Sequence, residues 1–534
     1  MTFLLRQLGR IDARRLWAWL RSQWSLTLGI ALAWFVVAYV AMYWAEGYRP
    51  LSFMTPDEAA NRFASSIISK TGRPFLELPF VDPEDCAHPR AWLSQGSYAI
   101  PIYPPVSIYF YALLTALRHI GSIALLALPA TGLGVFAAGT ARFLPNDRRW
   151  LAAFAPALGM PALYWLLRPW MNICGLLTCV CWAFYCWTRF RTGGAKHWLT
   201  ASMLCVGLGA AVRPDYTAYL LLLVLLLSFG VSPTIWRRLI ALALLAGGLA
   251  LGLNLYFNRL ITGHAFRAAY QMAMDADSTE PHKNPLVRLI ELLFFPLTFP
   301  GWKIAGGLFY KYWIGLQPLW LLTLGQLALV PLLRRQERWR RLTTLAALLL
   351  LVLFMLSRIT PALFGFGRDE GWVQDSIPRY WSPVYLLAGL PPLLFCARTP
   401  NRRALVAGTV LLTLLAAGNL FQVCWHSTQS LYRRHELAKQ ELAWLDRLEQ
   451  LVPRDAIVYS PVFDKILWSR FHSGSMEDLR LATASMRRAV DHGVPVYVCL
   501  KRELRGFDRA LERRGLLRVP VDAPLRCYRI SARS

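Results

Sequence analysis

The sequence is poor in charged residues and poorer still in acidic ones. Charged side chains make up 17% of its 534 residues, whereas 56% are hydrophobic and the mean hydropathy is +0.36. This composition excludes a disordered chain and argues against an ordinary soluble enzyme. Aspartate and glutamate number 31 against 58 lysines and arginines, so the formal net charge is +27. Most of this excess falls in short loops between apolar runs, which indicates membrane orientation and no nucleic-acid partner.

Several chemical signatures are also missing. No spacing of the nine histidines and ten cysteines is that of a zinc site, and no glycine-rich phosphate loop is present. The outer turn Arg168-Pro169-Trp170 adds no acidic residue, so a divalent ion bridging two outer loops is not supported. We therefore expect neither metal nor cofactor. Cys499 and Cys527 fall on expected strands and could pair in an oxidising compartment, but the sequence does not show that those strands are neighbours.

Long hydrophobic runs dominate what is there. A bilayer core of about 30 Å needs roughly 20 apolar residues in each helix. Eleven runs meet or approach this length: residues 26–45, 120–141, 150–167, 171–190, 198–212, 216–231, 239–257, 312–333, 342–357, 377–396 and 405–424.

The basic residues test this count of spans. They cluster at 6–21, 148–149, 189–196, 237–238, 334–341 and 398–403. With eleven spans every cluster lies on one side of the membrane, which predicts a cytoplasmic N-terminus and a C-terminus outside.

The remaining segments suggest three outer parts. Residues 46–103 form a long first outer loop, and residues 261–311 form a second one that includes an apolar stretch too short to span. In the tail, 425–534, strands are expected at 456–460, 495–500 and 525–530, with helices before and between them. The prediction is a polytopic α-helical membrane protein, with residues 1–424 in the membrane domain and a small α/β domain at 425–534.

Asp57 and Glu58 are the first candidates for chemistry. They follow Thr55 and Pro56 at the start of an expected helix in the first outer loop. One interpretation is structural, because Thr55 suits an N-cap, Pro56 suits the first helical position and Glu58 completes a capping box. The other is catalytic, because a carboxylate at the outer mouth of a membrane bundle can serve as a base.

Five short motifs, in order along the chain, carry a resemblance to a known family. They are Asp57-Glu58 in the first outer loop, the Tyr103-Pro104-Pro105 turn, Val212-Arg213-Pro214-Asp215 at the outer end of a span, the element from Tyr256 to His264, and Pro378-Arg379-Tyr380-Trp381-Ser382-Pro383. With them the chain resembles the GT-C class of integral-membrane glycosyltransferases, especially the bacterial family similar to aminoarabinose transferases and protein O-mannosyltransferases.

The resemblance implies a location and two substrates. Sugar transfer would take place at the periplasmic face of a bacterial inner membrane. The donor would be a polyprenyl-phosphate-linked sugar, and the acceptor a lipid, a glycan or a protein. The sugar and the acceptor are left open by the sequence.

The resemblance also implies roles for individual residues. Asp57 matches the position of the general base, with Glu58 beside it, and the expected outcome is inversion at the anomeric carbon. Arg213 and Arg379 are candidates to hold the donor phosphate, and Tyr380 could add a hydroxyl donor. Each arginine also has a structural interpretation, since Arg213 could pair with Asp215 at the end of a helix and Arg379 could extend to the interface.

A few further residues remain as substrate candidates. His88 could contact an acceptor or an ion, although a surface loop explains it better, and the acidic pair Asp369 and Glu370 ranks second to Asp57. The chain departs from the family at Tyr103, where the aminoarabinose-transferase-like members carry a lysine that helps to hold phosphate. Arg90 is a possible replacement.

Two other functions use similar sequences. A transporter or flippase of a lipid-linked substrate would share the basic loops, but transporters usually place ionisable groups near the middle of the membrane. A polysaccharide polymerase or ligase would also use lipid-linked sugars, but the Asp57-Glu58 loop after the first span favours the transferase.

Overall fold

The computed structural model describes most of the chain. It covers residues 23–46, 56–89, 92–217, 232–269, 376–426, 430–461, 463–467, 470–522 and 526–533, with a few single positions besides. The expected spans at 312–333 and 342–357, most of 216–231 and of 261–311, the pair Asp369 and Glu370, and Arg90 lie outside the described residues. The side chains of Asp57 and Tyr380 also lie outside them.

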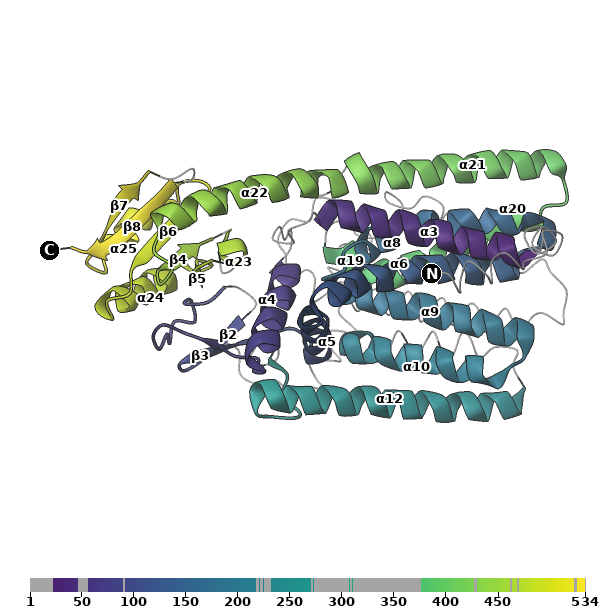
Figure 1. The fold of residues 1–534 in the computed structure, drawn as a ribbon, viewed down its shortest axis with the longest axis horizontal. Helices are drawn as coiled ribbons and strands as arrows, with labels where there is room; N and C mark the ends of the chain where they lie inside the picture. The colour runs from purple at the N-terminus through teal and green to yellow at the C-terminus, as the bar shows by residue number, and fades with distance from the viewer. Residues whose placement is uncertain are drawn as a thin grey trace, which may run out of the picture.

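A row of long helices forms the larger part of the molecule. They are α3 (Gln23–Glu46), α6 (Arg118–Phe143), α9 (Asn172–Gly193), α10 (Lys196–Val212) and α12 (Pro233–Thr262). Each packs on the next in the order α3, α6, α9, α10, α12 (Figure 1). Small residues allow close approach: a Cβ on Gly134 of α6 would lie 2.6 Å from the Ala31 carbonyl oxygen of α3.

Within the described residues, five stretches are long and apolar enough to cross a membrane. They are Leu26–Ala45, Arg118–Phe143, Asn172–Gly193, Pro233–Thr262 and Arg402–Leu437. These coincide with five of the spans expected from the sequence. A sixth, 198–212, is present as the 17-residue helix α10.

Two expected spans are broken, so the prediction of continuous helices there is wrong. Residues 150–167 form η1 (Asn146–Phe154), α7 (Ala155–Leu158) and α8 (Met160–Leu166), and residues 377–396 form α19 (Ser376–Ala388) and α20 (Leu390–Arg398). A proline is the second residue of α7, α8 and α20, in the first turn, where its missing amide leaves no helical hydrogen bond unmade. The two breaks meet: a Cβ on Gly159 would lie 2.9 Å from the Tyr385 carbonyl oxygen, and one on Gly389 would lie 2.8 Å from Leu158 Cβ.

The first outer loop folds across the end of this bundle. It contains α4 (Pro56–Thr71), a three-stranded antiparallel sheet of β1 (Leu76–Glu77), β2 (Trp92–Gln95) and β3 (Tyr98–Pro101), and then α5 (Pro105–Ala116). Helix α4 begins where the sequence predicted it. Helices α4 and α5 stand between the row of long helices and the C-terminal sheet (Figure 1).

A nearly continuous helical rod connects the bundle with the tail. It consists of α21 (Arg402–Phe421), a π-helical turn η7 (Gln422–His426) and α22 (Leu431–Leu451), and it runs along one edge of the molecule in Figure 1.

The tail contains a five-stranded mixed sheet in the order β5-β4-β6-β8-β7. Its elements are β4 (Ile457–Ser460), α23 (Asp464–Leu467), β5 (His472–Ser475), α24 (Leu479–Asp491), β6 (Val496–Leu500), α25 (Phe507–Glu512), β7 (Leu516–Val521) and β8 (Arg526–Ala532). The three strands expected from the sequence are β4, β6 and β8. Strands β5 and β7 were not expected; the His-Ser-Gly-Ser sequence of β5 lacks the β-branched and aromatic residues that indicate a strand. Cys499 and Cys527 lie opposite each other on β6 and β8 and form a disulfide, with their Cα atoms 4.3 Å apart.

Candidate functional site

Helix α4 places the acidic pair at its N-terminal end. Pro56 is its first residue, and Asp57 and Glu58 follow in the first turn. The N-terminal end of a helix carries a partial positive charge that favours carboxylates. The structure thus confirms the helix that the sequence predicted here, and the side chain of Asp57 lies outside the described residues.

The Glu58 carboxylate is fully buried between two arginines. Its Oε1 lies 3.1 Å from Arg434 Nη1, and its Oε2 lies 3.6 Å from Arg168 Nη1. The side chains of Glu58, Arg168 and Arg434 are 0%, 1% and 0% exposed. Because an isolated buried charge is very costly, removal of any one of the three groups is expected to destabilise this arrangement. The contacts place Glu58 in an ion-pair cluster, beyond the capping role that the sequence offered as its alternative to catalysis.

Arg168 belongs to the turn that follows α8. Its guanidinium lies 4.7 Å from the ring centre of Tyr164 and 5.2 Å from that of Trp165, so aromatic faces cover part of the cation. The Asn61 amide, one turn along α4 from Glu58, donates to the Trp170 carbonyl oxygen at 2.9 Å and to Asn172 Oδ1 at 2.8 Å. Helix α4 therefore contacts this turn through two successive helical turns, at Glu58 and at Asn61.

Arg379 approaches the same aromatic residue from α19. Its side chain is buried, and its guanidinium lies 6.0 Å from the ring centre of Trp165. The structure thus brings Arg379 near the Glu58 cluster, with Trp165 as the shared neighbour of Arg168 and Arg379. Tyr380 follows on the same helix, and its side chain lies outside the described residues.

Arg213 adopts the structural arrangement that the sequence offered as its alternative. At the end of α10 its Nε and Nη2 donate to the two carboxylate oxygens of Asp215 at 2.9 and 2.8 Å. The guanidinium also lies 5.1 Å from the ring centre of Tyr216. A bidentate pair of this kind occupies the guanidinium N–H groups that would otherwise donate to a phosphate.

His88 is buried rather than at the surface, so the expectation of a surface loop is wrong. The residue is 2% exposed, with Nδ1 2.9 Å from the Pro89 carbonyl oxygen and Nε2 2.6 Å from Asp85 Oδ1. Burial disfavours the imidazolium, but the hydrogen bond to Asp85 and its charge outweigh this and raise the pKa of His88. The pKa of Asp85 is lowered in turn, since its pairing with His88 outweighs its own burial.

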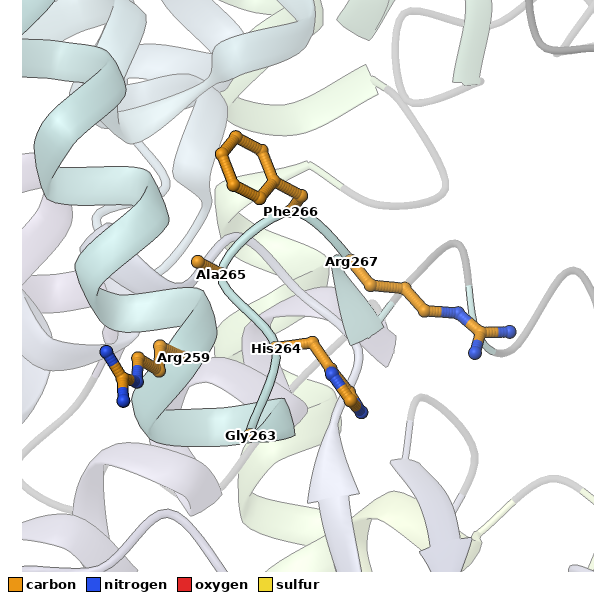
Figure 2. Close-up of a pocket in the computed structure, with 6 residues that line it drawn as sticks. All are labelled: Arg259, Gly263, His264, Ala265, Phe266 and Arg267. Atoms are coloured by element: carbon orange, nitrogen blue, oxygen red, sulfur yellow. The ribbon is translucent and has the colours of Figure 1, made fainter.

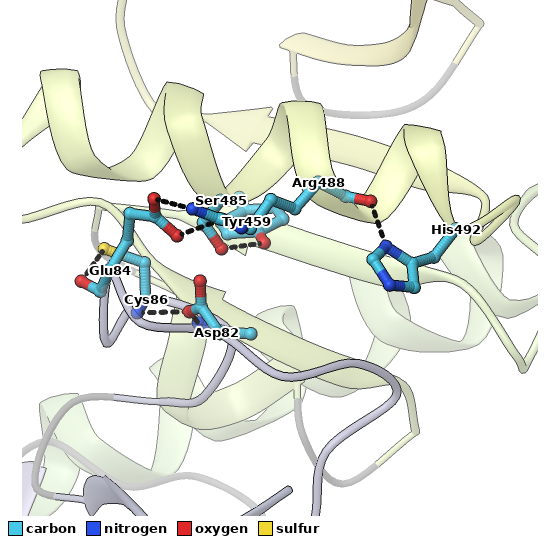
Figure 3. A network of polar contacts seen from close by, with 8 residues as sticks. Asp82, Glu84, Cys86, Tyr459, Ser485, Arg488 and His492 are labelled. Atoms are coloured by element: carbon cyan, nitrogen blue, oxygen red, sulfur yellow. Dashed lines mark hydrogen bonds and ion pairs between the residues drawn. The ribbon is translucent and has the colours of Figure 1, made fainter. Parts of the chain in front are cut away.

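The segment just before His88, with Asp82, Glu84 and Cys86, packs against α24 and the sheet of the C-terminal tail (Figure 3). Glu84 receives hydrogen bonds from Arg488 Nε and Nη2 at 2.8 and 3.1 Å, and the Ser475 amide donates to the Cys86 carbonyl oxygen at 2.8 Å. Asp82 accepts from the backbone amides of Cys86 and Ala87. Burial raises the pKa of Asp82, whereas Arg488 outweighs burial at Glu84 and lowers the pKa of that carboxyl.

The Tyr103 ring has a packing role in the structure. It is half-buried against the apolar cluster that contains Phe63 and Ile68 of α4 and Ile108 of α5. Tyr103 thus connects the two helices of the first outer loop.

A shallow hollow of about 650 Å³ lies in the loop that follows α12 (Figure 2). It is lined by Arg259, Gly263, His264, Ala265, Phe266 and Arg267. Gly263 has φ +75°, the left-handed conformation that ends many helices. The stacked rings of Tyr109 and Phe257, 4.4 Å apart, show that this end of α12 lies beside α5.

In the part of the chain that the structure describes, no group of three or more histidine, cysteine, aspartate or glutamate side chains could hold a metal ion.

Arg168 and Arg434 were not expected from the sequence as residues of the site. Arg168 follows an apolar run at its outer end, the same signal that singled out Arg213. Arg434 lies in a charged stretch next to Arg433, and nothing in the local pattern distinguishes the buried arginine from its exposed neighbour.

Comparison with known proteins gives structural similarities and no sequence relatives. No protein-family model matches the sequence, and no curated protein matches it. The fold is similar to the crystal structure of ArnT from Cupriavidus metallidurans in the apo state, with 14% identity, a TM-score of 0.45, and coverage of 95% of this chain and 98% of that chain. It is also similar to the apo oligosaccharyltransferase of Archaeoglobus fulgidus, with 12% identity, a TM-score of 0.36, and coverage of 90% and 70%.

Proposed function

We propose that this protein is a glycosyltransferase that moves a sugar, a pentose or a hexose, from a polyprenyl-phosphate donor to an acceptor at the periplasmic face of the bacterial inner membrane. About eleven helices would span the membrane, with the N-terminus in the cytoplasm and residues 425–534 as a periplasmic domain. The acceptor would be a lipid, a glycan or a protein.

One observation carries this proposal. The first turn of α4, which contains Asp57, is fastened beside a cluster of buried arginines at one end of the apolar bundle. Arg168 and Arg379 both lie against Trp165, so buried positive charge gathers close to the proposed base. A lipid donor with its phosphate at the membrane interface would find cations there, and its sugar would lie towards the outer loops.

The reaction follows from these groups. Asp57 takes the proton of an acceptor hydroxyl as its oxygen attacks the anomeric carbon. The bond between that carbon and the phosphate oxygen breaks at the same time, so the configuration inverts. The phosphate leaves with an added negative charge, which Arg379 stabilises, assisted by the Tyr380 hydroxyl. The proton on Asp57 then passes to water.

The other candidates are less direct in this scheme. Arg213 would have to exchange Asp215 for the donor phosphate, because its fork is already occupied. Arg90 would supply the cation that the family carries at the position of Tyr103. His88 stabilises the fold of the first outer loop and would affect the acceptor only through the conformation of that loop.

Two variants test the proposal. Asp57→Asn should lower transfer from a panel of polyprenyl-phosphate-linked pentoses and hexoses by about 10²–10⁴-fold, with polyprenyl-phosphate binding retained in a thermal-shift assay. Arg379→Ala should weaken that binding. Matched controls are Asp147→Asn and Arg402→Ala, which change exposed residues. Full transfer by Asp57→Asn would exclude it as the base, and a folded protein that binds no polyprenyl phosphate would favour a different membrane role.

A further inference from the structure

Arg434 reaches the proposed site from a part of the chain that the sequence assigned to a separate domain. Helix α22 begins after Ser430, whose Oγ accepts from the Arg433 amide at 3.3 Å. Arg433 itself is exposed, while Arg434, one position later, is fully buried against Glu58. The first turn of α22 therefore packs against α4 at Glu58.

The two arginines that hold Glu58 come from different places. Arg168 follows α8 in the bundle, and Arg434 lies in the first turn of α22, the helix that leads into the tail. Each guanidinium faces a different oxygen of the carboxylate. A carboxylate held on both oxygens cannot turn without breaking a buried ion pair, so the backbone next to it is also constrained. The adjacent residue on that backbone is Asp57.

Helix α22 is anchored firmly enough to transmit this constraint. At its start Trp44 of α3 stacks on His435, with ring centres 4.7 Å apart. At its other end Trp444, Leu445 and Leu448 belong to the same apolar cluster as Val458 of β4. Its 21 residues correspond to about 31 Å of helix, enough to hold the tail sheet and the bundle at a set distance.

We propose that Glu58 is a positioning residue through which helix α22 sets the orientation of the first turn of α4, and with it Asp57. This inference rests on the proposed function, in which Asp57 is the base. It makes the C-terminal tail part of the catalytic apparatus, through one buried ion pair.

Hydrogen exchange tests the coupling without any substrate. The amides of residues 60–62 bond to carbonyl groups of the first turn of α4, so their exchange reports whether that turn is held. In purified Arg434→Gln these amides should exchange about tenfold faster or more, while those of β6 and β8 keep their wild-type rates. Arg433→Gln is the matched control, and Arg434→Lys should restore most of the protection.

A double variant keeps this test decisive. In Glu58→Gln/Arg434→Gln both charges of this pair are removed, while Arg168 loses the Glu58 carboxylate just as it does in Glu58→Gln alone. The increase in exchange should therefore be smaller than the product of the two single increases. If Arg434→Gln exchanges like Arg433→Gln at residues 60–62, the proposal is overturned. If Arg434→Gln loses protection everywhere, the double variant decides: wild-type exchange at residues 60–62 overturns the proposal, and faster exchange confined to α4 supports it.

A kinetic measurement separates positioning from general damage. With a polyprenyl-phosphate-linked pentose or hexose that the wild type uses, Arg434→Gln should lower kcat about tenfold or more and leave KM for the donor within about twofold. An unchanged kcat with faster exchange would mean that the coupling does not serve Asp57, which overturns the proposal. A wild type that transfers no sugar would refute the proposed function, while the exchange results would still judge the coupling.

Discussion

Among the described residues, two ion pairs join the first outer loop to the C-terminal tail, and they differ in their access to water. Glu58 and Arg434 are both fully buried, whereas Glu84 is 14% and Arg488 47% exposed. Exposed pairs contribute about 0–1 kcal/mol, but removing one member of a buried pair costs about 3–5 kcal/mol. The buried pair therefore holds the loop and the tail in one arrangement, whereas the exposed pair contributes little to stability.

The exposed pair is supported by other contacts. Phe80, Cys86 and Ala87 join the apolar cluster of the tail, which also contains Ile457 and Val498. Docking at this place relies on apolar burial and on backbone hydrogen bonds, so it should survive the loss of its charges. We expect the contact at Glu58 to respond in the opposite way, and the following changes test this contrast.

The largest effect is expected at Arg168. Arg168→Met leaves Glu58 with one partner fewer in a fully buried place, and we expect the free energy of unfolding to fall by about 3–5 kcal/mol. Reversible unfolding in detergent, followed by protease susceptibility, would measure it. Arg191→Met, at an exposed arginine on α9, is the control. Equal losses in the two variants would mean that the buried pair has no special weight.

The disulfide in the tail should rank next. Its two cysteines are 28 positions apart, and opening a loop of this size by Cys499→Ser with Cys527→Ser should cost the tail sheet about 3 kcal/mol. Faster hydrogen exchange in β6 and β8 would report the loss. Cys424→Ser removes a free thiol and should leave these strands unchanged. If the amides of α4 lost their protection from exchange before those of β6 and β8, this would contradict the interpretation that the bundle anchors α4.

The pair His88–Asp85 should make the docked segment sensitive to pH. The pKa of His88 is raised above its usual 6.5. Its contribution to the stability of the fold is therefore complete below pH 6.5 and is lost as the pH rises through the higher folded pKa. The pKa of Asp85 is lowered below 3.8, so its contribution is present above 3.8 and is lost as the pH falls through the lower folded pKa.

The two contributions overlap between pH 3.8 and 6.5. The difference in unfolding temperature between wild type and His88→Gln should be largest in this window and should shrink on either side of it. His197→Gln, at an exposed histidine on α10, is the control. A difference that stays constant with pH would show that His88 contributes through packing alone.

The smallest effect is expected at Arg488. Arg488→Gln removes the exposed pair with Glu84 and should lower stability by less than about 1 kcal/mol, with a smaller effect at high salt. The neighbouring Arg487→Gln, which breaks a pair with Asp491 on the same helix, should behave alike in equilibrium unfolding. A loss as large as that of Arg168→Met would remove the contrast between the two contacts.

The parts of the fold that follow local rules could be predicted from the sequence. Helix α4 has a proline and two acidic residues in its first turn, β4 and β6 are short, fully buried strands rich in apolar residues, and β8 has both buried and exposed positions. The breaks at Gly159 and Gly389 were not predicted, because hydropathy alone does not show where, within an apolar run, one helix ends and the next begins. The neighbouring prolines were the available signal.

By itself the sequence determined the membrane class, the position of α4 and the placement of Asp57 and Glu58 in its first turn, because apolar length and first-turn chemistry act over neighbouring residues. Only the tertiary structure decided which arginines hold Glu58. Arg168 and Arg434 lie far apart along the chain, and each resembles many other basic residues that end a span or begin a helix. Burial distinguishes them, and burial depends on how the helices pack around α4.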